Sequence, residues 1–184
     1  MAASALQHMP LRVVFLTGFM GSGKTAVGRA LAQRLRWRFA DLDESIEQQG
    51  RAVAAIFAVE GEAAFRRVES LALERLLASH AGESLVAALG GGTLGIKQNR
   101  ARLRFPCSTV ILLEAPAEVL WQRCRAQQSE RPLLKDELSF RRLYAVRRTH
   151  YAGADAVIET GVRSVDQVAE EIERWMLARL SQQA

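Results

Sequence analysis

Residues 12–35 read RVVFLTGFMGSGKTAVGRALAQRL, and this stretch decides the fold. Its centre, GFMGSGKT at residues 18–25, matches the phosphate-binding pattern G-x-x-x-x-G-K-[ST]. An apolar run precedes the loop and a helix-forming run follows it, which is the strand-loop-helix context that the pattern requires. Glycines allow such a loop to form a nest of inward-pointing amides, and the helix adds its positive N-terminal end. The sequence therefore predicts a site for a nucleoside triphosphate rather than a chance glycine turn.

The residues of this loop have separate expected roles. Lys24 supplies a positive charge between the β- and γ-phosphates, and the hydroxyl of Thr25 is a ligand for Mg²⁺. We expect six consecutive residues to bind the phosphates: Gly21, Ser22, Gly23, Lys24, Thr25 and Ala26.

Outward from the loop, short apolar runs alternate with longer helical patterns, as in βαβ units. Five strands are expected, at Arg12–Thr17, Arg38–Asp41, Ser84–Leu89, Thr109–Leu113 and Ala156–Glu159. Seven helices are expected, at Lys24–Leu35, Glu44–Gln49, Ala52–Val59, Glu62–Ser79, Ala117–Gln127, Asp136–Gly153 and Val165–Ala178. The strands are continuously apolar, which is typical of parallel strands covered on both faces. The sequence predicts a three-layer α/β/α sandwich around a five-stranded parallel sheet.

Two carboxylates follow the second expected strand in the segment FADLD. Alternation at the strand end places Asp41 and Asp43 on the same side and leaves Leu42 to the core. Ligands of such sheets bind beyond the carboxyl ends of the strands, so both carboxylates should face the phosphate loop. One could hold the magnesium ion while the other accepts a proton from an acceptor hydroxyl. Alternatively, Asp43 only caps the next helix.

Three glycines, Gly90, Gly91 and Gly92, come directly after the third expected strand. A glycine triplet allows a ligand to approach the backbone and use its amides. No aspartate ends this strand, so we expect Asp41 to serve as the second carboxylate of the nucleotide site.

Composition excludes several classes of protein. The chain has 184 residues with a net charge of +5, and its 49% apolar content is that of an ordinary globular domain. It has no apolar run long enough to span a membrane and no signal peptide, so we expect a cytoplasmic protein. Cys107 and Cys124 are expected to be buried free thiols, and residues 1–10 a flexible tail before one domain at 11–184.

Basic residues are concentrated in the second half of the chain. Eight of them lie between Arg123 and Arg148, against three acidic residues. Such a cluster is consistent with nucleic-acid binding, with small anions bound by guanidinium groups, or with a solvated helix face. Composition alone does not choose among the three.

Together these motifs resemble the shikimate kinases, which are small P-loop kinases with a lid. The resemblance covers about Val13 to Leu180 and rests on six segments: GFMGSGKT, FADLDESIE, GEAAFRRVE, LGGG, ERPLL and Arg147-x-x-x-Tyr151. It implies transfer of the γ-phosphoryl group of ATP, with Mg²⁺, to the 3-hydroxyl of shikimate in aromatic amino-acid biosynthesis. It also implies a monomer that binds neither nucleic acid nor membrane.

The resemblance assigns further residues by position. Asp43 would bind the shikimate hydroxyls and act as base, and Arg66 and Arg147 would hold the carboxylate with amides of the Gly90–Gly92 triplet. Arg131 would reach the phosphates from a lid at about 127–135, and Arg125 and Arg163 would flank the adenine. Glu69, one helical turn after Arg66, could hold its guanidinium group in place.

Two features depart from the pattern of the family, since the lid and the segment after Tyr151 are each about one residue short. These differences leave the adenine contacts open. Three other functions also remain: a related small-metabolite kinase such as a gluconate kinase, a nucleotide-dependent nucleic-acid-binding module that uses residues 97–148, and a homologue that binds ATP without catalysis.

Overall fold

The computed structural model describes residues 12–50, 52–80, 82–126 and 136–182. Its strands are β1 (Val13–Thr17), β2 (Arg38–Asp41), β3 (Leu85–Ala88), β4 (Ser108–Glu114) and β5 (Ala156–Glu159). Its α-helices are α2 (Lys24–Leu35), α3 (Leu42–Glu47), α4 (Val53–Ser79), α5 (Lys97–Arg102), α6 (Ala117–Ala126), α7 (Glu137–His150) and α8 (Val165–Ser181), with a 3₁₀ turn η1 at Thr93–Gly95.

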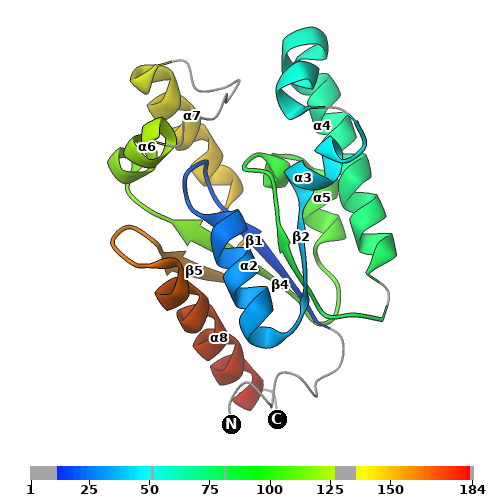
Figure 1. Ribbon diagram of the computed structural model, residues 1–184, viewed down its shortest axis with the longest axis vertical. Helices are drawn as coiled ribbons and strands as arrows, with labels where there is room; N and C mark the ends of the chain where they lie inside the picture. Colours follow the sequence, from blue (N-terminus) through cyan, green and yellow to red (C-terminus); the bar gives the residue numbers. More distant parts are fainter. Residues whose placement is uncertain (1–11, 51, 81, 127–135, 183–184) are drawn as a thin grey trace.

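All the strand pairings are parallel, and the strand order is β2-β3-β1-β4-β5. Helices α2 and α8 lie side by side over one face of the sheet, and α4 and α5 lie against the other (Figure 1). Helices α6 and α7 pack together near the phosphate loop through the cluster around Phe19 and Phe140. The predicted three-layer α/β/α fold with five parallel strands is confirmed.

Strand β1 divides the core into two layers. Val13 and Phe15 belong to the apolar cluster under α4, whereas Val14 and Leu16 belong to the cluster under α2 and α8. Every residue of this strand is buried. A strand buried on both faces has no polar positions to offer, and its sequence VVFLT is therefore apolar almost throughout.

The break expected between the third and fourth predicted helices is present. Helix α4 is interrupted at Gly61, which adopts φ 79° and ψ 176°, so two helical segments meet there as the separate ranges Ala52–Val59 and Glu62–Ser79 predicted. A positive φ of this size is readily adopted by glycine but rarely by other residues.

Other predictions need correction. Helix α3 begins two residues earlier than predicted, because the Asp41 side chain accepts hydrogen bonds from the Asp43 and Glu44 amides. The predicted helix Asp136–Gly153 is too long: Asp136 is its N-cap, and it ends at His150. Helix α5 and the turn η1 were not predicted at all. The prediction that Cys107 is buried is wrong, since this residue is exposed in the turn before β4 with φ 68°, whereas Cys124 is buried as predicted.

No helix in the described ranges is both long and apolar enough to cross a membrane. Residues 1–11 and 127–135, which include the expected tail and the expected lid, lie outside the part of the chain that the structure describes.

Candidate active site

The phosphate loop joins β1 to α2 at the carboxyl edge of the sheet. Gly18, Gly21 and Gly23 all have positive φ angles, between 80° and 146°. A Cβ on Gly18 would lie 2.4 Å from the Leu113 carbonyl oxygen, so no larger residue fits there. Helix α2 begins after Gly23 with no side-chain cap and no acidic residue in its first turn. Its positive end is therefore directed at the loop without a competing negative side chain.

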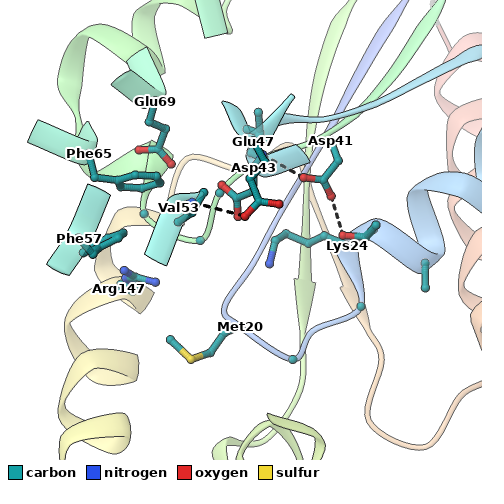
Figure 2. Close-up of a pocket in the computed structure, with 18 of the residues that line it drawn as sticks. Met20, Lys24, Asp41, Asp43, Glu47, Val53, Phe57, Phe65, Glu69 and Arg147 are labelled. Carbon is teal, nitrogen blue, oxygen red and sulfur yellow. Dashed lines mark hydrogen bonds between the residues drawn. The ribbon is translucent and has the colours of Figure 1, made fainter. Parts of the chain in front are cut away.

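Lys24 lies across this loop and lines the cleft in front of it (Figure 2). Its Nζ donates to the carbonyl oxygens of Gly18, at 3.0 Å, and Phe19, at 3.1 Å. The ammonium group is thus held above the residues that would surround a phosphate. This is the location that the sequence pattern predicts for the lysine.

Thr25 and Asp41 bring two oxygen donors together beside the loop. The Thr25 hydroxyl donates to Asp41 Oδ2 at 2.6 Å, while Asp41 Oδ1 accepts from the backbone amides of Asp43 and Glu44. Mg²⁺ prefers oxygen ligands and usually takes only one or two from protein, the rest coming from phosphate and water. A hydroxyl and a carboxylate at this distance therefore fit the magnesium site expected from the sequence.

Asp43 lies beside Asp41 in the same cleft, while the intervening Leu42 is fully buried. Its side chain is open to the solvent of the cleft but closely surrounded by the cleft walls. The pKa of Asp43 is raised from 3.8 to about 6, first by desolvation between the cleft walls and then by the nearby carboxylates of Asp41 and Glu69, whose effect exceeds the lowering by Lys24 and Arg66. A carboxylate with such a pKa is suited to accept a proton near neutral pH. The helix cap is supplied by Asp41, not by Asp43.

Each glycine of the triplet faces a different side chain of the cleft. A Cβ on Gly90 would lie 2.2 Å from Glu69 Oε1, and one on Gly92 would lie 2.3 Å from Arg66 Nη2. A Cβ on Gly91 would lie 3.1 Å from Arg147 Nη1. The missing side chains let charged groups from α4 and α7 approach the backbone after β3.

Arg66 is held between two carboxylates of its own helix. Its Nη1 donates to Glu69 at 2.8 Å, and its Nη2 donates to Glu62 at 2.9 Å. Burial alone would lower the pKa of Arg66, but Glu69 and Glu62 raise it overall. The predicted contact between Glu69 and Arg66 is therefore present.

Arg147 reaches the cleft from α7 and is buried. Within the described residues it has no carboxylate at ion-pair distance, and its guanidinium group lies 5.6 Å from the centre of the Phe19 ring. Burial lowers its pKa. The Tyr151 hydroxyl, one turn later, donates to the Gly91 carbonyl oxygen at 2.6 Å and ties the end of α7 to the triplet. A buried guanidinium group without a paired carboxylate is well placed to receive an anion.

These groups surround one cleft of about 600 Å³ at the carboxyl ends of β1, β2 and β3. In Figure 2, Lys24, Asp41 and Asp43 lie on one side of the cleft, and Phe57, Phe65, Glu69 and Arg147 lie across from them. Phe57 and Phe65, whose ring centres are 4.5 Å apart, form an apolar wall that sequence reasoning did not identify. The available signal was the position of Phe65 directly before Arg66. A cleft with charge at both ends and an apolar wall between them can bind two anionic ligands and bring them together.

Among the predicted residues that the structure describes, Ser22, Arg125 and Arg163 do not line this cleft. Arg125 lies exposed at the end of α6, and Arg163, after β5, forms an ion pair with Glu171 of α8. Arg131 lies outside the described residues. Arg123 instead links α6 to the turn after β5, since its Nη2 donates to the Thr160 carbonyl oxygen at 2.6 Å.

Comparison with known proteins gives a consistent result. The family model for shikimate kinase matches residues 20–177. A shikimate kinase of Persephonella marina is 40% identical over 164 residues, covering 88% of this chain and 97% of the relative. One from Symbiobacterium thermophilum is 47% identical over 165 residues, covering 86% and 92%. The structure of a shikimate kinase from Acinetobacter baumannii in complex with shikimate superposes with a TM-score of 0.86 at 34% identity, covering 96% of this chain and 98% of that one.

Proposed function

Because the chain belongs to the shikimate kinase family, we propose that it transfers the γ-phosphoryl group of ATP to the 3-hydroxyl of shikimate. The products are shikimate 3-phosphate and ADP. The observation that carries this proposal is that Asp43, Arg66 and Arg147 all lie against the glycine triplet, in the same cleft as a complete phosphate loop.

At the acceptor end, Arg66 and Arg147 hold the shikimate carboxylate together with amides of Gly90, Gly91 and Gly92. Planar guanidinium groups bind a carboxylate through two parallel hydrogen bonds, which fixes the orientation of the ring as well as its charge. Asp43 then binds the ring hydroxyls and accepts the proton of the 3-hydroxyl as its oxygen bonds to phosphorus. The bond between phosphorus and the β–γ bridging oxygen breaks, and ADP leaves.

At the donor end, the loop residues from Gly21 to Ala26 bind the ATP phosphates. Phosphoryl transfer depends mainly on alignment and charge neutralisation, which Lys24 supplies from this chain. Thr25 and Asp41 would hold Mg²⁺, which when bound neutralises phosphate charge. Arg131 is proposed to contact the phosphates, and Arg125 and Arg163 to flank the adenine.

We propose further that the enzyme acts in the cytoplasm as a monomer on small molecules, with neither nucleic acid nor membrane as partner. In the basic region, Arg141 pairs with Glu118 and Glu137, and Arg148 with Glu114, which favours the small-anion interpretation of the remaining arginines.

The direct test is ADP release with and without shikimate, with gluconate assayed beside it. The proposal requires ADP release that depends on shikimate and not on gluconate.

Replacing Arg66 by lysine is expected to weaken shikimate binding by about tenfold to a hundredfold. The charge remains, but the planar pair of donors is lost, and a hydrogen bond to a charged group contributes about 1.5–3 kcal/mol. ATP binding should change little. Calorimetry with each ligand separately measures both effects, and Arg67→Lys, an exposed neighbour on α4, is the matched control. An equal loss of ATP binding would show that Arg66 has a structural role and does not bind shikimate specifically.

The pH dependence of kcat/KM for shikimate should follow the ionisation of Asp43. Only its ionised form accepts the proton, so kcat/KM should rise with pH through about 6 and then level off. The measurement is kcat/KM from pH 5 to 8. A kcat/KM that is already level at pH 5 would contradict the raised pKa of Asp43, because an ordinary aspartate, with a pKa of about 4, is ionised there.

A further inference from the structure

The side chain of Thr93 has no part in the function proposed above, although it lies directly after the glycine triplet. Thr93 is the first residue of η1 and is fully buried. Its hydroxyl donates to Glu69 Oε1 at 2.7 Å. The other oxygen of Glu69, Oε2, accepts from Arg66 Nη1 at 2.8 Å. A chain of three side chains thus runs from η1 through α4 to the cleft.

Glu69 needs both of these contacts, because it is itself fully buried. A buried carboxylate is stable only when its oxygens are hydrogen-bonded. Gly90 leaves just enough room for it, since a Cβ there would lie 2.2 Å from Glu69 Oε1. The Thr93 hydroxyl is therefore the contact that fixes this oxygen against the triplet.

Arg66 has a competing partner on the other side. Glu62, one turn earlier on α4, accepts from both Nε and Nη2 of Arg66, and its side chain is 55% exposed. Glu62 therefore binds the guanidinium group from its exposed side and Glu69 binds it from its buried side, while both Nη1 and Nη2 lie next to Gly92. The position of Arg66 depends on how firmly Glu69 is held.

We propose that Thr93 is a positioning residue for the acceptor carboxylate: its hydroxyl fixes Glu69, and Glu69 fixes Arg66 over the glycine triplet. This inference rests on the proposed function, in which Arg66 binds the carboxylate of shikimate. It adds that the affinity for that carboxylate is set partly by a hydroxyl that does not touch the ligand.

The test compares Thr93→Val, which keeps the shape of the side chain and removes the hydroxyl, with Thr93→Ser, which keeps the hydroxyl. Thr93→Val is expected to raise the KM for shikimate by about tenfold, as for the loss of one hydrogen bond to a charged group. The KM for ATP should stay within about twofold of wild type, and Thr93→Ser should restore the KM for shikimate. Thr17→Val is a matched control, because Thr17 is equally buried but its hydroxyl has no hydrogen-bond partner among the described residues.

The possible results separate the alternatives. If the Thr93→Val variant keeps the wild-type KM for shikimate, or if the Thr93→Ser variant shows the same increase in KM as the valine variant, Thr93 does not position Arg66. If the KM values for both substrates rise in parallel, Thr93 has a general structural role, and this result also overturns the proposal. Should the valine variant fail to fold, Thr93→Ala takes its place and is compared with Thr93→Ser. Calorimetry with shikimate then decides between the same outcomes. If wild-type protein shows no shikimate-dependent ADP release, the proposed function has failed instead.

Discussion

The Lys24→Ala variant is expected to lose about a thousandfold in kcat while it keeps its fold. The ammonium group has no substitute in the loop, and removing one preorganised electrostatic contact to a transition state costs about a hundredfold to a thousandfold. The Lys24 side chain donates to the carbonyl oxygens of Gly18 and Phe19 and is not part of the apolar core. Stability should therefore change little.

The measurements are shikimate-dependent ADP release and the midpoint of thermal unfolding. Lys97→Ala, at the exposed start of α5, is the matched control and should resemble wild type in both. Near wild-type turnover in Lys24→Ala would remove the phosphate loop from the mechanism.

The Asp43→Asn variant is expected to lose about a hundredfold to ten-thousandfold in kcat, which is the contribution typical of a general base. It should also be more stable than wild type at neutral pH. The pKa of Asp43 is raised to about 6 in the folded chain, so its contribution to folding is fully present below about pH 4 and is lost as the pH rises through 6. An amide does not ionise and avoids this loss.

Denaturant unfolding at pH 4 and pH 8 checks the predicted gain in stability, which should appear only at the higher pH. Asp166→Asn, in the exposed first turn of α8, is the control for removing an aspartate charge. If the variant retains activity, Asp43 is not the base. If the variant is less stable than wild type at pH 8, Asp43 is not held in an unfavourable environment.

Sequence reasoning succeeded where a residue type has one dominant physical use. The loop from Gly18 to Thr25 predicted both the strand before it and the helix after it, and the spacing of Asp41 and Asp43 correctly placed both carboxylates in the cleft with Leu42 in the core. The break at Gly61 was also visible, because glycine interrupts two apolar helical patterns there.

It failed where tertiary contacts decide the outcome. Helix α5, with the sequence KQNRAR, has no apolar periodicity and depends on the turn that precedes it. The left-handed turn at Cys107 exposes a residue that directly follows Phe105 and Pro106. The wall formed by Phe57 and Phe65 comes from opposite sides of the break in α4, and nothing local indicates that both residues line the cleft.

The nucleotide end remains less complete than the acceptor end. Arg125 and Arg163 do not line the cleft, so their assignments stay predictions. The assignment of Arg131 also stays a prediction, because this residue lies outside the described part of the chain. A one-residue difference in loop length changes which side chain reaches a flat base, whereas the phosphate contacts depend on a backbone conformation that glycine fixes. For this reason the sequence predicts the phosphate loop better than it predicts the arginines that would flank the adenine.

The glycine triplet also limits how this chain could be adapted to high temperature. Replacing glycine by alanine often stabilises a protein by about 0.4–1 kcal/mol, because the unfolded chain then has less conformational entropy to lose. At Gly90 and Gly92 that route is closed, since the added methyl group would lie 2.2 Å from Glu69 and 2.3 Å from Arg66. Each folding event must therefore immobilise some of the freest backbone in the molecule. Heat resistance has to be sought elsewhere, for example at Gly153, where the φ angle is not positive and the nearest atom, on Arg104, would be 3.6 Å away.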